Sequence, residues 1–105
     1  MAEQVVVVAV ATPADGQGDA VREALTTVVP QVHGEPGCER YALHEREDGA
    51  FVMIERWASA DALREHGRGA ALAELGAALE GALAQPLDVT RMTALPAGDP
   101  DKGAL

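Results

Sequence analysis

The hydrophobic pattern at the start of the chain predicts a strand followed by a helix. Residues 5–11 read VVVVAVA, a β-branched run that is too short for a helix and is closely followed by a proline. Its lack of alternation predicts a strand covered on both faces. After the segment DGQG, apolar residues recur at helical spacing: Val21, Leu25, Val28, Val29 and Val32. We expect Asp19 to cap this helix, and Pro30 to make it fray or kink after Val29.

The middle of the chain predicts a β-hairpin. Two strand-like runs flank an Asp-Gly turn: residues 38–46 and residues 50–57. A two-residue turn would place Ala42 opposite Glu55, with Arg40 and His44 on the diagonals. A three-residue loop would place Tyr41 opposite Glu55 instead. The sequence leaves both registers open.

The second half predicts two helical stretches and a last strand. Ser59 is a good N-cap for a helix over 60–66, and the segment GRG interrupts before a second stretch over 69–84. That stretch carries one apolar stripe: Leu72, Leu75, Leu79 and Leu83. Alternation over 87–95 predicts the fourth strand, and the polar residues 96–105 predict a flexible tail.

These elements follow the order βαββαβ, which predicts an α+β, ferredoxin-like fold with a four-stranded antiparallel sheet and helices on one face. We expect one domain over residues 1–95. If the other face of the sheet were exposed to solvent, apolar and polar residues would alternate along its strands, yet they do not alternate in residues 5–11 and 51–54. The pattern therefore predicts a homodimer that packs sheet against sheet.

Composition and charge exclude several classes of partner. The 105 residues carry a formal net charge of −9, which would repel nucleic acid phosphates and an anionic membrane surface. The N-terminus has an acid where a secretory leader needs basic charge, and the apolar run after it is too short to span a membrane. The single cysteine, Cys38, cannot form an internal disulfide, and no zinc-ligand spacing exists. We expect a cytoplasmic protein without a metal site.

Two segments carry a recognisable motif pattern. They read PGCERY over 36–41 and ERWAS over 55–59, and Ala62-Leu63 and His66 follow. The pattern resembles the antibiotic biosynthesis monooxygenase domain, with its Gly-Cys-x-x-Tyr strand, Glu-x-Trp strand end and downstream histidine. The resemblance spans residues 5–95. It implies a dimeric α+β barrel that oxygenates phenolic or quinol-type polyketides without metal, flavin or haem.

Such chemistry needs a base, donors for an oxyanion and a dry apolar wall, because a phenol can reduce dioxygen once it is deprotonated. His66 is the candidate base. Trp57 offers an indole N–H, which we expect to meet a substrate oxygen or a backbone carbonyl. Glu55 shares a strand face with Trp57, and its carboxylate is either paired with a cation or shifted to a raised pKa. These three residues form the predicted catalytic set.

Four further residues are candidates for substrate binding: Tyr41, Phe51, Met53 and Arg91. Tyr41 can donate or accept a hydrogen bond, and Phe51 and Met53 share the face of Glu55. Arg91 interrupts the apolar side of the last strand, where it either complements a substrate oxyanion or, more commonly for such a residue, pairs with Glu55. The expected partners are a small aromatic substrate, dioxygen and a second copy of the chain.

Other functions of the same fold remain open at this point. A haem-binding relative would call for an asparagine on the first strand and a histidine on the last helix, but the chain has no asparagine and no histidine after position 66. A module that binds a small ligand or only dimerises would keep the fold without catalysis. A cofactor-free isomerase or lyase would use His66 and Glu55 as acid and base without oxygen.

Overall fold

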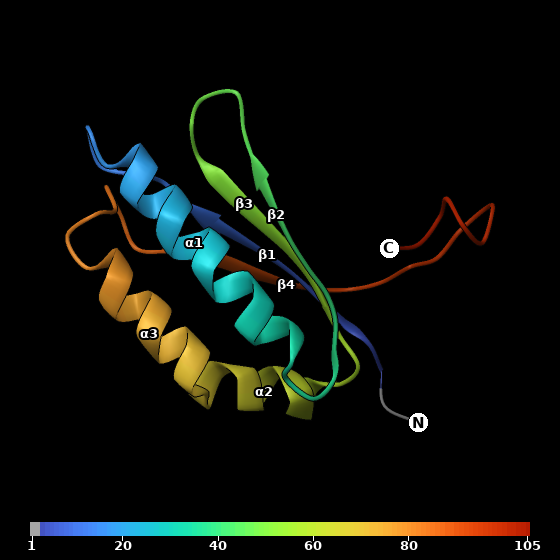
Figure 1. Cartoon of the computed structure of the whole chain (residues 1–105). Helices are drawn as coiled ribbons and strands as arrows, with labels where there is room; N and C mark the ends of the chain where they lie inside the picture. The colour runs from blue at the N-terminus through green and yellow to red at the C-terminus, as the bar shows by residue number, and fades with distance from the viewer. Residues whose placement is uncertain (1–2) are drawn as a thin grey trace.

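The computed structural model describes residues 3–105. Met1 and Ala2 lie outside the described residues, and with them the first two positions of the predicted domain and of the N-terminus that we expect not to be a secretory leader. The elements are, in order, β1 (Val5–Ala11), α1 (Gly18–His33), β2 (Cys38–Glu45), β3 (Phe51–Trp57), α2 (Ala60–Arg68), α3 (Ala70–Leu79) and β4 (Asp88–Thr93). The strands form one antiparallel sheet in the order β2-β3-β1-β4. Figure 1 shows α1 and α3 side by side over one face of this sheet, with α2 leading into α3. The predicted α+β, ferredoxin-like fold is confirmed.

The loop between β2 and β3 decides the register of the hairpin. Tyr41 lies opposite Glu55, which is the register of the three-residue loop. Arg40 and His44 lie opposite Arg56 and Val52, so they occupy the other face of the sheet from Glu55. Of the two registers that the sequence left open, the structure has the one that brings Tyr41 next to Glu55.

Helix α1 differs from the prediction at both ends. Asp19 lies in its first turn, and Gln17 occupies the N-cap position without a side-chain hydrogen bond. At the other end the helix continues through Pro30 to His33, so the expected fraying after Val29 is wrong, and the alternative, a kink at this point, stays a prediction. Val28 and Val32 are buried on either side of the proline. Their packing offsets the single backbone hydrogen bond that a proline removes from a helix.

In the second half one helix is longer than predicted, and the other helix and the last strand are shorter. Helix α2 extends through the expected interruption, and only Gly69, with an extended backbone, separates it from α3. Helix α3 ends before Gly81, whose φ of +77° turns the chain. Leu83, expected on the helical stripe, therefore lies outside the helix and forms an isolated bridge with Pro13. Strand β4 is shorter than 87–95, it lies at an edge of the sheet, and each of its residues is exposed.

The two faces of the sheet have different surroundings. On the inner face, alternate strand residues pack with α1 and α3 into the core: Val7, Ala11, Tyr41, Phe51, Met53 and Trp57 with Val21, Leu25, Val32, Leu75 and Leu79. On the outer face the alternate residues of the two central strands, β1 and β3, are also largely apolar: Val6, Val8, Val10, Val52 and Ile54. Within residues 3–105 no helix covers this outer face (Figure 1).

The segment after β4 leads away from the sheet (Figure 1). The expected flexibility of residues 96–105 stays a prediction. Among residues 3–105, none of the helices has the length and apolar character needed to cross a membrane.

Candidate active site

A cavity of about 590 Å³ lies between the inner face of the sheet and the helices. Residues of all four strands line one side of it, and residues of α2 and α3 line the other. Most of the lining is apolar: Val7, Ala9, Phe51, Met53, Leu63, Leu72, Leu75, Leu87 and Val89. The predicted contacts Phe51 and Met53 therefore belong to the cavity wall. This size and lining are typical of sites for small molecules.

One row of residues crosses the sheet on the cavity side. Tyr41 lies opposite Glu55, Glu55 lies opposite Val7, and Val7 lies opposite Arg91. Directly opposed residues of neighbouring strands point to the same face, so these four side chains stand side by side. All four line the cavity. The row thus presents a phenol, a carboxyl group, an apolar spacer and a guanidinium to whatever occupies the cavity.

His66, on α2, faces the cavity from the helical layer. Its Nδ1 lies 2.6 Å from Oε1 of Glu35, and only 6% of the residue is exposed. Its ring packs against Trp57, with ring centroids 4.5 Å apart, and against Tyr41, at 5.6 Å. We assign the proton to Nδ1 from the contact with Glu35, which leaves the lone pair on Nε2. A histidine oriented in this way by a carboxylate is suited to act as a general base.

Glu35 is a site residue that the sequence did not predict. It lies in the loop between α1 and β2, 31 positions before His66, so no helical or strand periodicity links the two residues. The available signal is local: Glu35 is the one carboxylate in the Gly-Glu-Pro-Gly turn that precedes the Gly-Cys-x-x-Tyr segment. Glycine and proline restrict the backbone conformation of a loop, and such a loop can hold a side chain against a helix that is distant in the sequence.

Gly37 allows this loop to lie directly on α2. It adopts a φ of +82°, and a Cβ at this position would lie 2.5 Å from the Cβ of Ala62. We expect Gly37→Ala to lower the free energy of unfolding by about 2 kcal/mol or more, because it adds backbone strain and a clash with α2. Urea denaturation measures this change. Gly34→Ala is the matched control, since a Cβ there meets only the Gln31 oxygen, at 3.5 Å; equal losses in both variants would contradict the prediction.

The side chains of Trp57 and Glu55 form a hydrogen bond with each other. The indole N–H of Trp57, which is 0% exposed, donates to Oε1 of Glu55 at 2.9 Å. The partner of Trp57 is thus a carboxylate, and neither of the two expected partners, a substrate oxygen or a backbone carbonyl, takes this hydrogen bond. Trp57 lies outside the cavity lining and behind the His66 ring. Its geometry suits a residue that positions His66 and Glu55.

Burial raises the pKa of Glu55 above its usual range, and the Trp57 hydrogen bond and the nearby His66 offset only part of this effect. Of the two states that the sequence allowed for Glu55, a cation partner or a raised pKa, the structure supports the second. Burial, together with the nearby Glu55 and Glu35 carboxylates, also raises the pKa of Tyr41. The Tyr41 hydroxyl therefore stays protonated at neutral pH and can donate a hydrogen bond.

Arg91 makes no ion pair within residues 3–105, so the expected pair with Glu55 is wrong. The two residues belong to the same row, but Val7 and its strand lie between them. Arg91 is exposed at the edge of the cavity. Two further arginines, Arg64 and Arg68, line the cavity from α2 and were not predicted. Each of them is paired with an acidic residue of its own helix.

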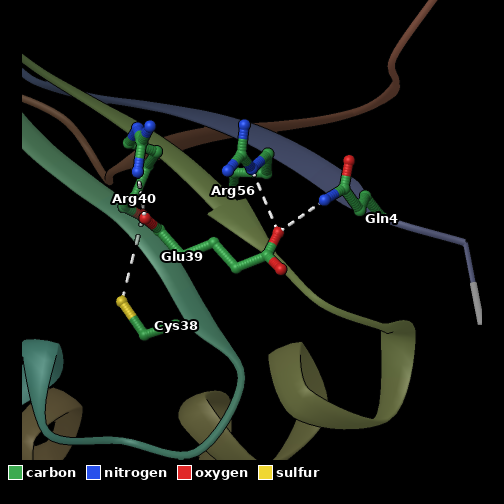
Figure 2. Close-up of polar contacts among 5 residues, drawn as sticks. All are labelled: Gln4, Cys38, Glu39, Arg40 and Arg56. Atoms are coloured by element: carbon green, nitrogen blue, oxygen red, sulfur yellow. Dashed lines mark hydrogen bonds and ion pairs between the residues drawn. The ribbon is translucent and has the colours of Figure 1, made fainter.

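A second polar cluster lies at the start of β2, apart from the cavity lining (Figure 2). A bulge shifts the register between Cys38 and Arg40. The carboxylate of Glu39 accepts hydrogen bonds from Arg56 at 3.0 Å and from Gln4 at 2.8 Å. Figure 2 shows these side chains reaching from three neighbouring segments toward one carboxylate. The cluster ties together the ends of the strands, and we assign it no chemistry.

Within residues 3–105, no group of three or more histidine, cysteine, aspartate or glutamate side chains is placed to hold a metal ion. The single cysteine, Cys38, is free and partly buried. That the protein uses no metal or other cofactor stays a prediction.

Comparison with known proteins identifies the family. The family model described as antibiotic biosynthesis monooxygenase matches residues 4–78. Rv0793 from Mycobacterium tuberculosis is 30% identical, with a TM-score of 0.84 over 91% of this chain and 99% of its own. PA3566 from Pseudomonas aeruginosa is 27% identical, with a TM-score of 0.83 over 90% and 97% of the two chains. A Caulobacter crescentus protein, provisionally named an antibiotic biosynthesis monooxygenase, is 25% identical, with a TM-score of 0.82 over 90% and 92%. Among curated proteins none matches the chain in sequence. The chain belongs to the antibiotic biosynthesis monooxygenase family.

Proposed function

We propose that the protein is a cofactor-independent monooxygenase that oxidises an aromatic polyphenol, quinol or polyketide-type substrate with dioxygen. The observation that carries this proposal is the buried His66, held by Glu35, at the wall of an apolar cavity of about 590 Å³. Membership of the family supports the same class of reaction. A reducing compartment such as the cytoplasm suits the single free cysteine.

The first step is removal of a phenolic or benzylic proton. Nε2 of His66 accepts this proton, and the Glu35 carboxylate stabilises the imidazolium that forms. The Tyr41 side chain packs against the His66 ring, and its hydroxyl donates a hydrogen bond to the developing oxyanion. The substrate anion thus forms in a largely apolar space, where these few polar groups act strongly.

The substrate anion supplies the electrons for the second step. It transfers one electron to dioxygen, and the resulting radical pair combines to form a C–O bond and a peroxide. Where the reacting carbon began as a methylene group, the hydroperoxide loses water and leaves a carbonyl. One oxygen atom enters the product and the other leaves as water, and the methylene carbon supplies all four electrons. The Glu55 carboxyl, whose pKa burial raises, can in its protonated form give the proton that the leaving hydroxide needs.

Oxygen uptake by the purified, metal-free protein tests this proposal. The substrates are a panel of hydroquinones and anthrones, and their autoxidation is subtracted. The proposal requires uptake that saturates with substrate, matches the oxygenated quinone formed and releases no hydrogen peroxide, because the second oxygen atom leaves as water. No uptake across the panel by folded protein would contradict it and favour a binding module, whereas turnover that is independent of oxygen would favour an isomerase or lyase.

We also propose that two copies pack together through their outer sheet faces. Within the described residues no helix covers this face, and its apolar residues Val8, Val52 and Ile54 are only partly buried. A contiguous apolar surface of this kind is characteristic of an interface.

Replacing Ile54 by lysine tests the dimer. We expect Ile54→Lys to weaken dimerisation by about 100-fold or more, because each interface would gain two buried, unpaired charges. Sedimentation velocity over a concentration series measures this change. Glu74→Lys, on the exposed surface of α3, adds a lysine away from the sheet and should leave the dimer intact. A wild-type chain that stays monomeric at micromolar concentration would refute the dimer.

A further inference from the structure

The cavity has a polar end around His66, and a separate cation, Arg91, lies on the same face of the sheet at its opposite edge. In the row Tyr41, Glu55, Val7 and Arg91, the outer two positions belong to the two edge strands. Arg91 is two strands from Glu55, which corresponds to about 10 Å at the usual strand spacing. Between them Val7 offers only an apolar surface.

Arg91 differs from the other cations at the cavity. Arg64 and Arg68 also line it, but Arg64 lies 2.8 Å from Asp61 and Arg68 lies 3.6 Å from Glu65, so both already have an acidic partner. Within residues 3–105, Arg91 alone among these three has no carboxylate at ion-pair distance. A guanidinium in this position has its five N–H donors available to a ligand.

The charges at the two ends of the row would fix the orientation of a ligand. The Glu35 and Glu55 carboxyl groups lie at the His66 end, so a substituent that is already anionic before the reaction, while His66 is neutral, is disfavoured there. The chain as a whole carries a net charge of −9, so no general attraction gathers anions on it. An anionic ligand must therefore be bound by a local cation, and Arg91 is placed for this.

We infer that the cavity selects aromatic acids: fused-ring phenols that carry a carboxylate at the end opposite the reacting phenol, with Arg91 binding that carboxylate. This inference rests on the proposed function for the identity of the reacting end. Guanidinium and carboxylate match in geometry and form paired, charge-assisted hydrogen bonds. Arg91 is then a specificity-determining residue, and His66 meets the phenol at the far end.

Calorimetric titration tests the inference without requiring turnover. The probes are 6-hydroxy-2-naphthoic acid, its methyl ester, and 3-hydroxy-2-naphthoic acid, in which the two groups are adjacent. The wild-type protein should bind the first acid about 10- to 100-fold more tightly than its ester or the adjacent isomer, the range expected for a charge-assisted hydrogen bond. Arg91→Gln should remove this preference and leave the affinity for the ester unchanged.

Arg64→Gln is the matched control, because it removes an arginine from the same cavity that already has an acidic partner. It should keep the preference for the acid. Equal binding of acid and ester by the wild type, no binding of either, or equal effects of the two substitutions would each overturn the inference. Oxygen uptake separates the two proposals: acid selectivity without uptake refutes only the monooxygenase, and uptake with neutral quinols but no acid selectivity refutes only the role of Arg91.

Discussion

His66→Asn is expected to lower kcat for oxygen uptake by about 100-fold or more, because it removes the general base. Asparagine cannot accept the proton, but its side-chain amide can occupy the position of Nδ1 and donate to Glu35. The contact that joins α2 to the preceding loop is therefore kept. The loss then reports proton transfer at Nε2, and urea denaturation of the same variant checks that the fold is retained.

His33→Asn is the matched control for this experiment. Nε2 of His33 lies 3.0 Å from the backbone oxygen of Tyr41, and His33 is outside the cavity lining. We expect its kcat to stay within about twofold of the wild-type value, as for most changes away from a reacting centre. A wild-type rate in His66→Asn would move the base to Glu55 or to water. A matching loss in His33→Asn would indicate a general effect on the cavity.

The fold could be predicted because its signals act over short stretches of chain. The β-branched run of β1, the Asp-Gly turn and the leucine stripe each define one element. The errors lie where distant packing competes with a local signal. Pro30 should end a helix, but Val32 beyond it is 0% exposed and belongs to the core, so α1 continues. Leu83 matched the helical stripe, but the turn at Gly81 ends α3 before it.

The candidate site was predictable only in part, for a related reason. Tyr41 and Glu55 reach the same row through strand pairing, which the turn length restricts to two registers. The bond between Trp57 and Glu55 follows from their separation by two positions on one strand, and it could have been predicted. Glu35 could not, because its contact with His66 depends on how a loop packs against a helix 31 positions later.

Glu35→Gln is expected to lower kcat by about 10- to 100-fold while KM stays within about twofold, as for other residues that orient a reacting group. Glutamine keeps the size of the side chain, and its amide oxygen can still accept from Nδ1 of His66. What it removes is the negative charge, which stabilises the imidazolium only after the proton has moved. An interaction made only during the reaction affects kcat and leaves substrate binding unchanged.

Two measurements distinguish this positioning role from a purely structural one. Glu74→Gln removes an exposed carboxylate from α3 and controls for the change in net charge, so its kcat should match that of the wild type. ¹⁵N NMR of the His66 ring should show a proton on Nδ1 in the wild type, and loss of this tautomer preference in Glu35→Ala. If Glu35→Gln instead lowered the free energy of unfolding and left kcat unchanged, Glu35 would serve only to anchor the loop to α2. The electrostatic part of the proposed mechanism would then have to come from Glu55, the buried carboxyl group near His66.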